Sequence, residues 1–186
     1  MTRTRICSLL GCLGLILLVC TVAVAAEEKA YNVELNSFEK NPKINDDEKW
    51  VDWGDLRMKK VSKNKFTLTG TFEFKRNMGD EQKLSMQVFM YDDSTQEKGA
   101  MVMNVEKPFC QFVNEDEDTY PYLQKSSDLP EQGGCPFPKG TYTIDKYELE
   151  TTFLPDDAPK GDYLIELNTL DKDMPVTGLL ASVTLT

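Results

Sequence analysis

The stretch FTLTGTFEFK, residues 66–75, decides the fold class of this chain. Apolar residues or glycine occupy every second position, and threonine, glutamate or lysine occupy the positions between them. Because a strand places successive side chains on opposite faces, this alternation predicts a half-buried β-strand. The turn Asn77–Asp80 ends it.

The same alternation recurs in residues 84–91 and 101–105, and we expect these three closely spaced strands to be antiparallel neighbours. Pro108–Leu123 breaks the pattern and predicts one short helix, which Pro121 either ends or restarts. Further strands are expected at 31–35, 56–60, 142–153, 163–167 and 179–185.

About eight short antiparallel strands with turns between them indicate an all-β fold, an immunoglobulin-like β-sandwich with one short helix. A lipocalin-type barrel would give similar local signals, so both architectures remain open at this point.

The N-terminus has the pattern of a secretory signal. Arg3 and Arg5 precede an uncharged apolar run from Ile6 to Ala26 that ends in small residues. The run is long enough for a membrane anchor as well, but its Ala/Val ending and the lack of a basic stop favour cleavage after Ala25 or Ala26. We therefore expect a cleaved signal peptide, residues 1–26, a secreted extracellular protein and a single domain of residues 27–186.

Cleavage removes three of the five cysteines and leaves Cys110 and Cys135. In an oxidising compartment these two most simply form a disulfide, and two free buried thiols are the alternative. Cleavage also removes two of the 21 basic residues, which leaves 19 basic against 31 acidic residues and a formal charge of −12. Such a surface repels nucleic acid, so no nucleic-acid partner is expected.

The chain contains no histidine, which excludes the Ser-His-Asp and Cys-His arrangements of nucleophilic enzymes and most zinc sites. No glycine-rich phosphate loop follows a strand. Paired carboxylates remain conceivable, but the acids cluster in polar runs such as residues 115–118, which are typical of a solvated face. Asp92-Asp93 and Asp171/Asp173 do not match the spacing of an EF-hand loop. We therefore expect neither an enzyme, nor a metal site, nor a cofactor.

Two short motifs carry a resemblance to a known family. CPFPKGTY at residues 135–142 is followed by APKGDY at residues 158–163. This pair resembles the ML lipid-recognition superfamily, and most closely the secreted ML-like proteins of insects, among them the chemosensory CheA and CheB groups. The ganglioside activator protein is a more distant relative. The resemblance implies a two-sheet cup that holds an apolar ligand between its sheets.

The methionines of consecutive strands suggest where such a ligand would lie, because methionine suits surfaces that adapt to varied apolar molecules. Core filling is the plain alternative for the same residues. The resemblance and the alternation together predict an apolar pocket lined by Phe72, Phe74, Met86, Val88, Met90, Met101, Met103, Val105, Tyr163 and Ile165.

Two functions follow from this sequence. The first is a secreted carrier of a lipid or other apolar small molecule, in chemosensation by the resemblance, with transient contact to a receptor or membrane surface. The second is a protein- or glycan-interaction module with a filled core and an aromatic patch around Trp50 and Trp53. The sequence does not indicate the ligand or the oligomeric state.

Overall fold

The structure is a computed structural model that describes residues 31–45, 49–62, 65–117, 119–148 and 158–186. The expected signal peptide lies outside these residues. In the described part, no helix is both long enough and apolar enough to cross a membrane. The elements are β1 Val33–Lys40, β2 Val51–Asp52, β3 Arg57–Ser62, β4 Lys65–Phe74, β5 Gln82–Asp92, β6 Glu97–Pro108, α1 Phe109–Glu115, α2 Tyr120–Lys125, β7 Gly140–Glu148, β8 Gly161–Asp171 and β9 Met174–Leu185.

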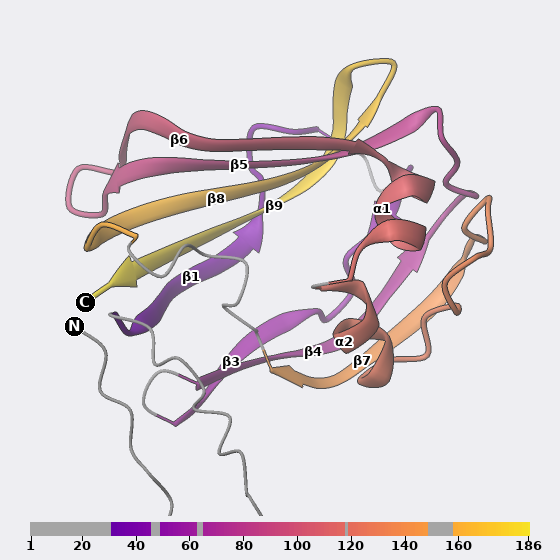
Figure 1. Ribbon diagram of the computed structural model, residues 1–186, viewed down its shortest axis with the longest axis horizontal. Coiled ribbons are helices and arrows are strands. Elements are labelled where there is room, and N and C mark those ends of the chain that lie inside the picture. The colour runs from indigo at the N-terminus through magenta and orange to yellow at the C-terminus, as the bar shows by residue number, and fades with distance from the viewer. Residues whose placement is uncertain (1–30, 46–48, 63–64, 118, 149–157) are drawn as a thin grey trace, which may run out of the picture.

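The strands form two antiparallel sheets. One sheet has five strands in the order β1-β9-β8-β5-β6, and the other has the order β2-β4-β3 with β7 paired to β4. Figure 1 shows the five-stranded sheet above β3, β4 and β7, with both helices at one end of the molecule. The all-β sandwich predicted from the alternation is confirmed, whereas the barrel alternative is not.

The strand partners of residues 66–74 were predicted wrongly. β4 does not pair with β5, since β4 lies in the smaller sheet and β5 pairs with β6 and β8 in the larger one. The connection between β4 and β5 crosses between the sheets and is anchored at Met78, which is fully buried. Met78 and Phe137 exchange two backbone hydrogen bonds, of 2.9 and 2.7 Å. Alternation identifies the buried face of a strand but not its neighbour.

The helical segment divides into two short helices. Pro108 precedes α1, and Pro121 lies in the first turn of α2, where its missing N–H is not needed. Cys110 of α1 forms the predicted disulfide with Cys135, and their Cα atoms are 5.9 Å apart. The disulfide therefore fastens the helical end of the molecule to the loop that enters β7.

The two motifs behind the family resemblance share one structural device. Tyr142 donates its hydroxyl hydrogen to the carbonyl oxygen of Pro138 at 2.8 Å. Tyr163 does the same with Pro159 at 2.6 Å. Each tyrosine is buried near the start of a strand, so its hydroxyl satisfies a carbonyl of the preceding loop while its ring packs in the core. The motifs thus fix the entries to β7 and β8.

Candidate functional site

The inner face of the five-stranded sheet is identified by its contacts with the opposite sheet. Trp53, which follows β2, donates its indole N–H to the hydroxyl of Thr177 on β9 at 3.0 Å. Leu84 of β5 packs against the cluster that contains Phe72 and Phe74 of β4. Alternate residues from Leu84 on β5, and those paired with them, therefore face the interior of the sandwich.

One row of this inner face is only partly covered. Met86 lies directly between Val105 of β6 and Leu167 of β8 in the sheet register. Leu167 is 41% exposed and Val105 is 36% exposed, although β8 is the central strand. Inward leucines of central strands are usually buried, because their exposure forfeits hydrophobic stabilisation. We call Val105, Met86 and Leu167 the exposed apolar row, which spans three strands or roughly 10 Å.

The exposed apolar row lies between two closed clusters. On one side, the aromatic cluster fills the end of the sandwich near the helices. Phe74 contacts Phe137 at 5.3 Å and Phe109 at 5.8 Å between ring centroids. On the other side, the next row of the same sheet contains Val88 and Ile165, which are only 4% and 9% exposed. The uncovered row is thus a local feature and not a general looseness of the sandwich.

On β5 and β8 the inner positions around this row carry no charge, whereas the edge strands place Lys107 beside Leu84 and Lys40 beside Leu179 on the same face. From Leu84 to Met90 on β5, and from Tyr163 to Thr169 on β8, the inward residues are apolar apart from the threonine and the tyrosine hydroxyl. The charged residues of these strands lie on the outer face, where Glu166 pairs with Lys98 at 2.5 Å. The row can therefore offer dispersion and hydrophobic contact but no acid–base chemistry.

The ten residues predicted to line a pocket separate into three groups. Phe72 and Phe74 belong to the filled aromatic cluster in the opposite sheet. A second group packs in the cluster on the five-stranded sheet: Met86, Val88, Met103, Tyr163 and Ile165. The third group is exposed: Met90, Met101 and Val105.

The predicted direction of Met101 is wrong. Met103 pairs with Val88 on the inner face, but the register then shifts, and Met101 pairs with Phe89, which faces outward. Val102 is the extra residue of this β-bulge, and one extra residue reverses the alternation of everything beyond it. Met90 faces inward, opposite Tyr163, yet lies near the end of its strand with half of its surface exposed.

Leu167 is the site residue that the sequence prediction missed. The alternation of Tyr163, Ile165 and Leu167 places it on the inward face, so its direction was available in the sequence. Its exposure was not, because exposure depends on how far the opposite sheet reaches.

Two surface pockets, of about 440 and 420 Å³, are lined by other residues than the ten. Within the described residues, the one group with metal-ligand spacing is Asp80 with Cys110 and Cys135. Both sulfurs are joined in the disulfide, so they are not thiolate ligands. Trp50 and Trp53 are partly buried against the aromatic cluster and do not form the exposed patch that the interaction-module alternative requires.

Comparison with protein families finds one match. Residues 84–165 match the family described as "Protein of unknown function (DUF1091)". The matched segment runs from β5 into β8 and includes both helices, the disulfide, and two of the three residues of the exposed apolar row. No curated protein matches the chain. The match shows similarity to this family over less than half of the chain, and the family's description assigns no function.

Proposed function

We propose that this protein is a secreted carrier that holds a lipid or other apolar small molecule between its two β-sheets. The observation that carries the proposal is the exposed apolar row on the inner face of a central strand. Leu167 and Val105 together leave apolar surface uncovered where a sandwich with a filled core would bury it. A bound apolar molecule would bury that surface.

Three further features support the proposal. The inner positions of β5 and β8 beside the row are uncharged, which suits an apolar ligand, and the charged side chains on this face, Lys107 and Lys40, lie on the two edge strands. The PKGxY motifs, which resemble those of the ML superfamily, fix the entries to β7 and β8 and so set the framework of the cup. The disulfide between Cys110 and Cys135 fits the oxidising compartment that the N-terminal signal indicates. Chemosensation is the process that the resemblance favours.

Mass spectrometry of ligands extracted from natively purified protein tests the proposal directly. We expect a reproducible apolar molecule, and the mature chain should begin at Ala26 or Glu27. Protein that is repeatedly empty and does not take up a fluorescent fatty acid or a hydrocarbon probe would support the interaction module with a filled core instead.

A pair of variants locates the site. Leu167→Glu places a charge in the exposed apolar row and should weaken binding of the fluorescent fatty acid at least tenfold. Val61→Glu is the matched control, because Val61 is 62% exposed on β3 in the opposite sheet. It should bind within twofold of the unchanged protein. Equal binding by both variants would place the ligand elsewhere.

A further inference from the structure

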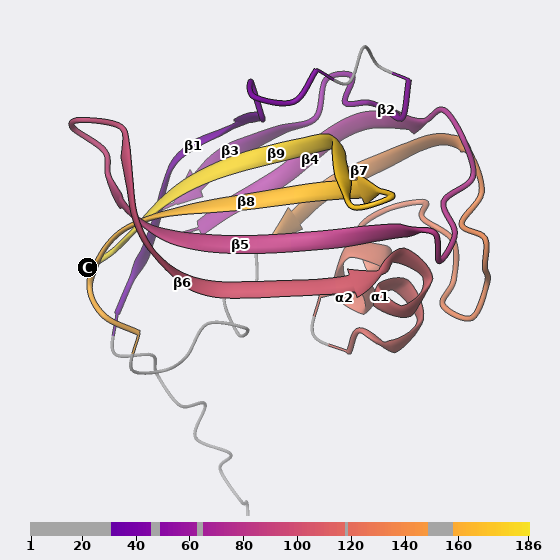
Figure 2. The same cartoon turned by 90° about the horizontal axis from the view of Figure 1, so that it is seen from above.

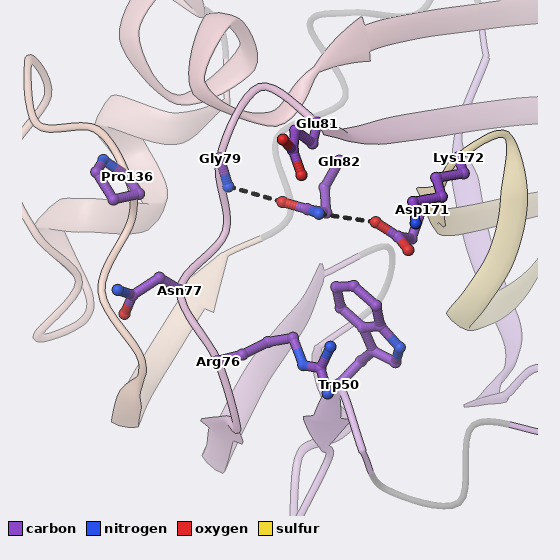
Figure 3. Close-up of a pocket in the computed structure, with 9 residues that line it drawn as sticks. All are labelled: Trp50, Arg76, Asn77, Gly79, Glu81, Gln82, Pro136, Asp171 and Lys172. Atoms are coloured by element: carbon purple, nitrogen blue, oxygen red, sulfur yellow. Dashed lines mark hydrogen bonds between the residues drawn. The ribbon is translucent and has the colours of Figure 1, made fainter.

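A second, polar site lies at the start of β5 and the end of β8, beyond Leu84 and Thr169. It is a surface pocket of about 440 Å³. Figure 3 shows the side chains that line it, with Arg76 beside Trp50 on one side and Glu81, Gln82 and Asp171 on the other. The lining residues are Trp50, Arg76, Asn77, Gly79, Glu81, Gln82, Pro136, Asp171 and Lys172.

The Arg76 side chain is restrained at the pocket in a way that suits binding of an anion. The guanidinium of Arg76 lies over the indole of Trp50, with its central carbon 4.2 Å from the ring centroid. The neighbouring acids Asp52 and Glu73 form ion pairs with Lys75, whose Nζ lies 3.5 and 2.7 Å from their carboxylate oxygens. Within the described part of the chain, Arg76 has no carboxylate partner. Stacking on an aromatic face restrains a guanidinium and leaves its in-plane N–H donors available.

The acids of the pocket are held on its other side. Gln82 is 8% exposed, accepts a hydrogen bond from the Gly79 N–H at 2.9 Å and donates one to Asp171 at 2.8 Å. This bridge fixes one Asp171 oxygen. Glu81 is exposed, and the described residues supply it with no ion-pair partner. Lys172 follows Asp171 in the two-residue turn between β8 and β9, where both central residues have positive φ.

The charges are balanced in the pocket although the chain as a whole carries −10. Two cations and two carboxylates line it, and Arg76 is not paired with either acid. A simple anion would meet Glu81 and Asp171, and a simple cation would meet Arg76. A molecule that carries both charges satisfies both sides.

We propose that this pocket binds a compact zwitterion, with its phosphate or carboxylate on Arg76 and its ammonium group toward Glu81 and Asp171. The site is independent of the exposed apolar row. The residues Thr177 and Thr169, which are 0% and 5% exposed, and the indole of Trp53 close the sandwich between the two sites.

Isothermal titration calorimetry of the mature protein with phosphocholine tests the proposal, with inorganic phosphate and choline chloride as single-charge probes. Phosphocholine should bind at least tenfold more tightly than either of them. Arg76→Gln should weaken phosphocholine binding at least fivefold. Asp171→Asn should do the same, since it removes the charge but keeps an acceptor for Gln82.

The matched control is Arg57→Gln. Arg57 is the other arginine of the described residues and pairs with Asp55 at 2.9 Å, away from the pocket. It should bind as the unchanged protein does, and so should Leu167→Glu, which separates failure of this site from failure of the apolar one. No binding of phosphocholine, equal binding of phosphate alone, or unchanged binding by Arg76→Gln would each overturn the proposal.

One further arm identifies the source of the zwitterion. If the unchanged protein co-sediments with phosphatidylcholine vesicles and Arg76→Gln does not, the pocket binds a lipid headgroup. If only free phosphocholine binds, it takes a soluble molecule. Either result upholds the zwitterion site.

Discussion

The exposed apolar row makes a quantitative prediction about stability. Ile165 and Leu167 are inward residues of β8, one row apart, and they are 9% and 41% exposed. Replacing each by alanine removes a side chain of the same size from the same strand, and the higher strand propensity of isoleucine accounts for only part of a scale that spans about 1 kcal/mol. The difference between the two variants therefore reports how well each position is covered.

For Ile165→Ala we expect a loss of about 3 kcal/mol in the free energy of unfolding, which combines lost burial with a cavity in the cluster. For Leu167→Ala we expect about 1 to 1.5 kcal/mol. Full burial of a leucine contributes roughly 1.5–3 kcal/mol, and Leu167 loses less because 41% of its surface is already exposed. Solvent also fills the space left by the truncation, so no empty cavity adds to the loss. With a typical urea dependence of about 2 kcal/mol per molar, the midpoints should fall by about 1.5 M and 0.6 M.

Urea unfolding of ligand-free protein, followed by tryptophan fluorescence and circular dichroism, measures both losses. Addition of the apolar ligand should stabilise the unchanged protein and should do so less in Leu167→Ala, because a weaker ligand adds less stability. Equal losses in the two variants would mean that Leu167 is covered in solution. The proposed site between the sheets would then lose its structural basis.

Three further outcomes are expected from the fold. Replacing both Cys110 and Cys135 by serine should lower the free energy of unfolding by roughly 3.5 kcal/mol, from the entropy of a loop of about 26 residues; melting the unchanged protein with and without reductant checks it. Gly70→Ala should cost more than about 2 kcal/mol in urea unfolding, because Gly70 has φ of 135° and a Cβ would lie 2.6 Å from backbone; Gly134→Ala, with open space around it, should stay within about 0.5 kcal/mol. Burial raises the pKa of Tyr120 to about 12, so the folded state keeps a proton that the unfolded chain releases near pH 10; stability should fall between about pH 10 and 12, and Tyr120→Phe should flatten that fall in melts across this range.

The sequence was sufficient wherever local chemistry determined the structure. The alternation of residues 66–74 predicted β4, and Pro108 marked the start of the helical segment, which Pro121 restarts as α2. The pairing of Cys110 with Cys135 followed from counting the cysteines that remain after cleavage. In each case the deciding interaction lies within a few residues or admits one partner.

The sequence was insufficient where the outcome depended on a distant strand. Phe72 and Phe74 were correctly predicted to face inward, yet they fill a closed aromatic cluster instead of lining a pocket. Leu167 was equally inward by pattern and is left uncovered. Whether an inward side chain meets a partner depends on the reach of the opposite sheet, which no local period encodes.

The β-bulge that turns Met101 outward also bends the edge of the five-stranded sheet. Beyond Val102 a second register shift follows before Lys98, and two bulges in one edge strand bend the β5–β6 hairpin. Figure 2 shows the connection between these strands turned toward the β9 side. There Asp93 accepts a hydrogen bond from Ser182 at 3.4 Å, and Lys98 reaches the buried Glu166.

The bulges thus direct Met101 away from the interior and bring the end of the hairpin over the outer face of β8 and β9. They also disrupt the straight edge that a 12-residue strand would otherwise offer to another chain. On the outer face, Leu164 of β8 and Leu180 of β9 are buried, whereas the inward Leu167 of β8 is 41% exposed. The exposed apolar surface of the central strand β8 therefore lies on its inner face, where the proposed ligand would bind.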